Sequence, residues 1–189
     1  MKTILILIAL LLSNLSLTQV VSYETFDSDL LNKKVLIEIN KLRRNRGLDT
    51  LVPSVSVYNI YSKPNCIEVA GSGKFYHPET NERFNNQYLR NLITDESKKM
   101  HGGQNVLLSN GSPKINEYEN GFKSTMIYNT YDELAQRIII AWENSPSHKE
   151  AQNLPYSSSN IPGVFACHSV MNPDGTIFVF VNYIKIFRV

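Results

Sequence analysis

The sequence predicts an α+β fold in which helices pack on an antiparallel sheet. Three observations lead to this prediction. Residues 29–46 repeat apolar side chains with helical spacing, and a second segment of the same kind begins at Thr130. The last part of the chain holds two apolar runs, 161–170 and 176–187, separated by a strong turn signal at 172–175.

The first predicted helix covers residues 29–46. Its apolar stripe consists of Leu31, Val35, Ile39 and Leu42, widened by Leu30 and Ile37. Basic residues fill its last turn, where cations favour the helix dipole, and Gly47 suits the end of the helix. We therefore interpret this basic cluster as a helix-end feature rather than a ligand-binding patch.

The middle of the chain carries weaker signals. Residues 54–62 are weakly helical, Pro64 interrupts the pattern, and 66–70 resumes it after a kink. Residues 71–73 are expected to form a loop. Within the polar segment 74–100 we expect one short helix at 85–95, followed by a short strand at 105–108 and a loop over 109–128.

The second long helix has the clearest start signal. Thr130 and Glu133 have the spacing of a capping box. The apolar face that follows consists of Leu134, Ile138, Ala141 and Trp142. Ser145-Pro146 ends this helix, and the same pair is suited to start another, with Ser145 as the N-cap and Pro146 at the first helical position.

The N-terminus resembles an export signal. Lys2 is followed by an almost unbroken apolar run over 3–12, then a polar stretch and small residues before Ser22. We expect a signal peptide at 1–22 and one domain at 23–189, secreted or, in a Gram-negative bacterium, periplasmic. The alternative is an uncleaved N-terminal anchor, but the run is too short to span a bilayer stably.

Composition excludes several classes of protein. Hydrophobic residues make up 42% of the chain, which argues against intrinsic disorder. The 19 basic and 17 acidic residues give a net charge of +2, which disfavours nucleic-acid binding. Outside the cell, Cys66 and Cys167 would be oxidised to one disulfide; two separate buried thiols are the alternative.

Among the four histidines, His148 is the best placed for chemistry. It lies in the first turn of the helix that starts at Pro146, where the positive helix end favours a neutral ring able to bind a metal or accept a proton. A surface or capping histidine is the alternative. Cys167 and His168 are neighbours on a strand and point to opposite faces, so they form no catalytic dyad.

A series of short motifs resembles one known family. They are Asn40-Lys41-Leu42-Arg43, Gly47-Leu48 with Leu51, His77, Gly103-Gln104-Asn105-Val106, Ala141-Trp142-Glu143-Asn144-Ser145-Pro146-Ser147-His148 and Pro162-Gly163-Val164. In this order, over residues 30–187, the chain resembles the CAP superfamily, also called the SCP domain, in its bacterial-type secreted branch. The resemblance implies a three-layer α-β-α sandwich around a central antiparallel sheet.

The same resemblance implies a cleft with two histidines and two acidic residues, which in some members binds a divalent metal. His77 and His148 match the histidines, Gln104 stands where the family has Glu, and Glu143 is the remaining candidate. Because glutamine is neither a base nor a good zinc ligand, we expect at most weak binding of a divalent metal such as zinc at His77 and His148, and no other cofactor.

These residues favour a non-enzymatic secreted protein. Its cleft would bind a small apolar ligand or an extracellular partner, such as a lipid, a sterol or a cell-wall fragment. Two alternatives stay open: a metal-dependent, protease-like hydrolase that uses His77 and His148, and a structural surface-interaction protein with a vestigial cleft.

Overall fold

The computed structural model describes residues 20–77, 98–110, 130–153 and 163–188. Nearly all of the expected signal peptide, the helix expected at 85–95 and most of the loop expected at 109–128 lie outside these described residues. The described part has an α+β fold, which confirms the fold class predicted from the sequence.

The sheet has four described strands in the order β1-β3-β4-β2. Strand β4 (Thr176–Arg188) runs antiparallel to β3 (Val164–Met171) and to β2 (Lys98–Asn110). The three long strands are antiparallel as predicted, and β1 (Val52–Pro53) adds a short parallel pairing with the start of β3, so the sheet is mixed. The strand expected at 105–108 is longer than predicted, because its polar first half is paired along β4.

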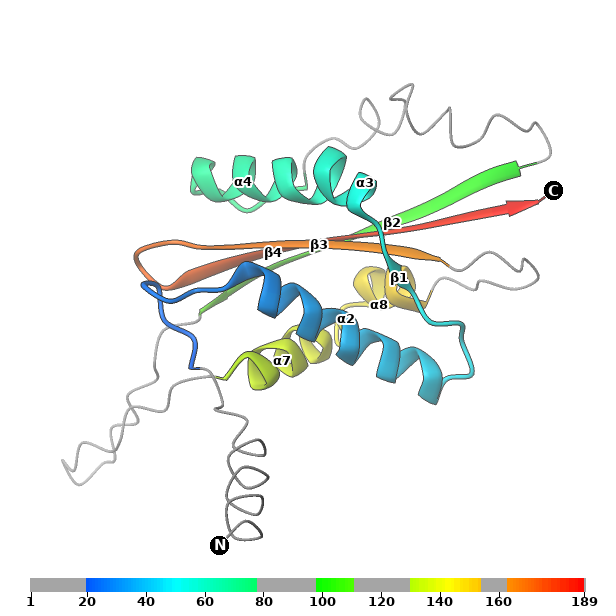
Figure 1. Cartoon of the computed structure of the whole chain (residues 1–189), viewed down its shortest axis with the longest axis horizontal. Helices are drawn as coiled ribbons and strands as arrows, with labels where there is room; N and C mark the ends of the chain where they lie inside the picture. Colours follow the sequence, from blue (N-terminus) through cyan, green and yellow to red (C-terminus); the bar gives the residue numbers. More distant parts are fainter. Residues whose placement is uncertain (1–19, 78–97, 111–129, 154–162, 189) are drawn as a thin grey trace, which may run out of the picture.

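Helices cover both faces of this sheet (Figure 1). On one side lie α2 (Ser28–Asn45), α7 (Tyr131–Glu143) and α8 (Pro146–Asn153), and on the other lie α3 (Val55–Val57), the π-helical turn η1 (Tyr58–Ser62) and α4 (Lys63–Ser72). Side chains along β4 point alternately to the two faces of the sheet and so pack in both layers. Val179 packs in the cluster with α2 and α7, while Phe180 packs against α4.

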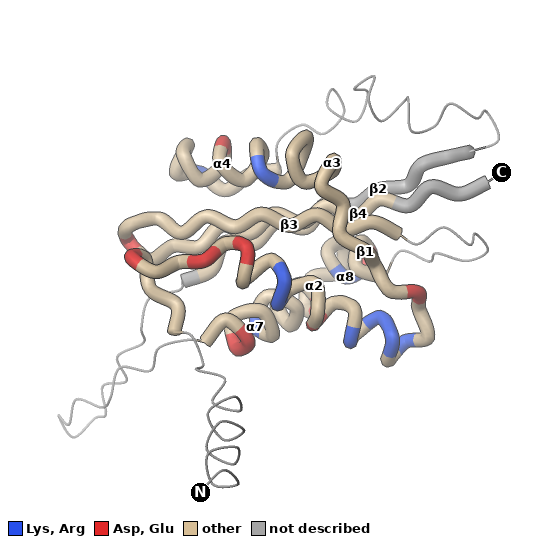
Figure 2. Tube along the Cα trace, in the orientation of Figure 1, with Lys and Arg blue, Asp and Glu red and all other residues tan. Residues whose placement is uncertain are grey.

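Helix α2 begins where Asp27 caps it, since the Asp27 carboxylate accepts a hydrogen bond from the Leu30 amide at 2.9 Å. Of the predicted apolar stripe, Leu31, Val35 and Ile39 are buried, whereas Ile37 is 55% exposed. The basic residues gather in the last turn (Figure 2). One of them departs from the prediction: Arg43 is fully buried. Its guanidinium donates to the Asp49 and Gln152 carbonyl oxygens at 2.7 and 2.6 Å, so it joins α2 to the end of α8.

The segment around Pro64 contains no break between two helices. The chain passes from α3 through η1 directly into α4, with Pro64 in the first turn of α4. Proline is tolerated there, because the π-helical turn precedes it and the first amides of a helix need no partner within that helix. Helix α4 continues through residues 71 and 72, which were expected to form a loop, and Gly73 ends it at a φ of 65°.

Helix α7 confirms the sequence prediction closely. Thr130 and Glu133 form both hydrogen bonds of the capping box, at 3.2 and 2.9 Å. Trp142 is fully buried, and its indole donates to the Val106 carbonyl oxygen at 3.4 Å. Helix α8 begins at Pro146, as predicted.

The two cysteines do not form the expected disulfide. Both are free and buried. Cys66 packs with Phe178 and Phe180 on the α4 side of the sheet, whereas Cys167 packs in the cluster on the α2 side. The prediction of a bond is therefore wrong for this structure, because the sheet separates the two side chains. The structure agrees instead with the alternative interpretation, in which Cys66 and Cys167 are two separate buried thiols.

Candidate functional site

Three residues of the predicted cleft meet beside the edge strand β2. His77 Nδ1 lies 3.1 Å from Gln104 Oε1, within hydrogen-bonding distance. The rings of His77 and His148 have centroids 6.1 Å apart and planes inclined by 35°. These residues come from the segment after α4, from β2 and from the first turn of α8, so the fold brings together side chains that are far apart in the sequence.

Local structure explains how the segment after α4 and the start of α8 are both held beside β2. Gly73 ends α4 in a left-handed conformation, and the following segment packs Tyr76 against the cluster on the α4 side before it reaches His77. On the other side, the Asn105 side chain donates to the His148 carbonyl oxygen at 3.1 Å and to the Tyr183 hydroxyl at 3.3 Å. Asn105 therefore ties the start of α8 to β2.

The electrostatics of the site favour neutral histidine at His148. Burial lowers its pKa below the ordinary value, and the nearby His77 lowers it further, because two imidazolium rings repel one another. The His148 ring is therefore uncharged at neutral pH. Its own position in the first turn of α8 agrees with this, since the positive helix end disfavours a cation.

Gln104 supplies an amide in place of a carboxylate. Its oxygen faces His77, while its buried amide nitrogen has no hydrogen-bond partner among the described residues. An unpartnered buried donor is costly unless something binds it. The amide nitrogen of Gln104 is therefore an unsatisfied donor in the described part of the chain.

Glu143 is engaged elsewhere. It forms an ion pair with Arg46 of the segment after α2, and the Gln152 amide donates to its carboxylate at 2.9 Å. Within the described part of the chain, no hydrogen bond or ion pair joins Glu143 to either histidine. Its charge is therefore used to hold α7 against the end of α2.

The donor set bears on metal binding. In the described ranges, no group of three or more His, Cys, Asp or Glu side chains converges on a point where a metal ion would sit. Catalytic zinc sites use three protein ligands, most often histidine, cysteine or carboxylate. Two imidazoles and a neutral amide do not match that set, so the weak zinc site remains a prediction.

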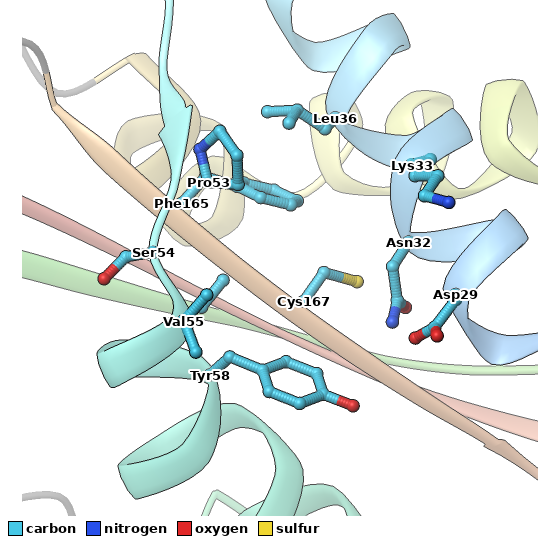
Figure 3. Close-up of a pocket in the computed structure, with 11 residues that line it drawn as sticks. Asp29, Asn32, Lys33, Leu36, Pro53, Ser54, Val55, Tyr58, Phe165 and Cys167 are labelled. Atoms are coloured by element: carbon cyan, nitrogen blue, oxygen red, sulfur yellow. The ribbon is translucent and has the colours of Figure 1, made fainter.

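A second feature, which the sequence did not indicate, lies at the opposite edge of the sheet. There a groove of about 370 Å³ opens between α2, the start of α3 and strand β3 (Figure 3). Close to it, the Tyr58 hydroxyl lies 3.0 Å from His168 Nδ1. No sequence signal pointed to this groove, because the residues that line it come from segments far apart in the chain.

Comparisons with known proteins find similarity among solved structures. No protein-family model matches the sequence, and no curated protein matches it. Among solved structures, the chain is similar to an outer surface protein from Borrelia burgdorferi, with 20% sequence identity and a TM-score of 0.48. The matched region covers 83% of this chain and 92% of that one. Over the residues that the structure describes, no helix is both long enough and apolar enough to cross a membrane.

Proposed function

We propose that this chain is an exported CAP-type domain that binds an extracellular ligand without catalysing a reaction. The binding site is the cluster of His77, Gln104 and His148. The order of the motifs along the sequence supports the family assignment, and the meeting of these three side chains beside β2 supports the site.

The hydrogen bond between His77 and Gln104 is the observation that carries this proposal. An amide beside two imidazoles provides donors and acceptors but no negative charge. Such a site suits a neutral polar group, for example a hydroxyl or an amide, more than it suits a cation. Lipids, sterols and cell-wall fragments all present such groups next to apolar or bulky portions, so they form the ligand class.

A hydrolase is the second candidate, and one observation favours it. Because the pKa of His148 is lowered, its neutral ring is available as a general base at physiological pH. Hydrolysis would also need an acid or a metal to stabilise the developing charge. Gln104 supplies neither, so binding is the better-supported function.

Zinc titration separates the two functions. We compare the wild-type protein with Gln104→Glu, and we use Gln136→Glu, on the exposed face of α7, as the matched control. The wild type should bind zinc weakly, Gln104→Glu should bind it on the order of tenfold more tightly or better, and the control should behave as the wild type. Stoichiometric tight zinc in the wild type would contradict the proposal, as would the absence of any gain in Gln104→Glu.

Ligand identification tests the binding function itself. The secreted protein and a His77→Ala/His148→Ala double variant are purified in parallel without detergent, and their organic extracts are compared by mass spectrometry. We expect a lipid, sterol or cell-wall fragment in the wild-type extract and its loss from the variant. Equal amounts in both, or no such compound in either, would argue against this site. A folded variant is verified by circular dichroism.

A further inference from the structure

The groove at the β3 edge is lined mainly by apolar side chains. Its walls come from α2 and from the start of α3, and β3 forms its floor (Figure 3). The apolar lining consists of Leu36, Pro53, Val55, Phe165, Ala166 and Cys167. Val55 lines the groove and is 74% exposed.

The backbone of β3 leaves one position open in this groove. Val52 and Ser54 donate to the carbonyl oxygens of Gly163 and Phe165, each at 2.9 Å. Odd-numbered residues of β3 therefore direct their N–H and C=O groups away from β4, toward the β1 edge. Farther along, the Ser169 amide donates to the Ser28 hydroxyl oxygen at 3.4 Å.

Cys167 lies between these two points. No hydrogen bond to its N–H or C=O is present among the described residues, because β1 ends at Pro53 and the chain turns away into α3. The residue is only 4% exposed, so this donor and acceptor lie at the bottom of the groove. Backbone groups that are buried without partners are rare and costly in folded proteins.

We propose that this groove binds a short extended peptide with apolar side chains, which adds to the edge of β3 in line with β1. The peptide runs antiparallel to β3, so that one of its residues pairs its own N–H and C=O with those of Cys167. An apolar side chain fills the space beside Leu36 and Val55. A peptide backbone carries a donor and an acceptor at the spacing that a strand edge requires, and strand addition is a common mode of peptide recognition.

Two features restrict the length of this peptide. At one end, β1 already pairs with Val164 and Phe165. At the other end, Ser28 occupies the amide of Ser169, and the side chains of Asp29, Asn32 and Tyr58 give the groove a polar mouth (Figure 3). The peptide therefore contributes one paired residue and its immediate neighbours. This proposal is independent of the histidine cluster, which lies beside β2 at the other edge of the sheet.

The test uses the blocked tripeptide acetyl-Val-Leu-Val-amide and amide-resolved NMR of the folded protein. Hydrogen exchange at the Cys167 amide should slow by about tenfold or more at saturating peptide, because a protein–peptide hydrogen bond then protects it. Val55→Asp places a charge on the apolar wall and should weaken binding by about tenfold or more. The matched control is Ile67→Asp, an exposed position on α4 outside the groove, which should bind as the wild type.

A second peptide distinguishes strand addition from simple burial of apolar groups. The same tripeptide with an N-methyl group on its central leucine lacks the N–H that must pair with the Cys167 carbonyl, and we expect it not to bind. Equal binding of the methylated peptide, unchanged exchange at Cys167, or no effect of Val55→Asp would each overturn the proposal. A dimer that forms without peptide and is broken by Val55→Asp would overturn it as well, since a second copy would then fill the groove.

Discussion

Replacing Trp142 with alanine should cost more stability than almost any other single change in this domain. The side chain projects from α7 and is fully buried, in the cluster that also holds Leu134 and Ile138. Truncating a buried tryptophan to alanine costs about 3–5 kcal/mol of unfolding free energy. The indole hydrogen bond to Val106 is long, at 3.4 Å, so most of this cost comes from lost packing.

The consequence for thermal unfolding follows from the size of the chain. At roughly 2–4 °C per kcal/mol for a domain of this length, Trp142→Ala should lower Tm by about 6–20 °C. Chemical unfolding in urea, followed by far-ultraviolet circular dichroism, measures the free energy directly. Fluorescence is unsuitable for the comparison because Trp142 is the only tryptophan in the chain.

The control is Ile140→Ala, two residues earlier on the same helix. Ile140 is 58% exposed, so its truncation should change the unfolding free energy by no more than about 0.5 kcal/mol. A cost below about 1 kcal/mol for Trp142→Ala would refute the assignment of Trp142 to the core between α7 and the sheet. Equal costs for the two variants would also count against the packing argument, because Ile140 is exposed and Trp142 is buried.

Two further predictions concern titratable groups. Burial lowers the pKa of both His148 and His168, so the unfolded chain binds these protons more tightly than the folded protein. Stability should therefore fall as the pH drops from about 7 to 5, and His168→Gln should make the dependence of Tm on pH shallower; a flat wild-type profile would contradict this. Burial also raises the pKa of the Cys66 thiol to about 12 and that of Cys167 well above its ordinary value. Both thiols should resist alkylation in the native state and react fully in denaturant without reductant. If the mass of the denatured, alkylated protein showed no modified cysteine, the two thiols would not be free, which would contradict the structure.

Local signals in the sequence predicted those elements whose causes are local. The capping box at Thr130, the apolar face that ends at Trp142 and the turn at 172–175 were all read correctly, because each depends on residues within a few positions of one another. Helix α2 was predicted to within one residue at each end for the same reason. Periodicity also identified its buried stripe.

Interactions between distant segments were predicted less well. Arg43 looked like a helix-end residue, yet it is buried because the end of α8 packs over it and offers a carbonyl oxygen. The disulfide prediction failed because the spacing of two cysteines along a sequence does not show which face of a sheet each one occupies. The polar half of β2 escaped notice because it has no apolar alternation of its own and is paired along β4.

The sequence by itself determined the α+β class, the main helices, the terminal hairpin and the identity of His77, Gln104 and His148 as residues of interest. Only the tertiary structure decided that these three side chains meet, that Glu143 pairs with Arg46, and that a groove opens where β1 stops short of Cys167. The physical reason is that capping and periodicity act over one or two turns of chain. The approach of residues 27 or 97 positions apart depends on how whole layers pack.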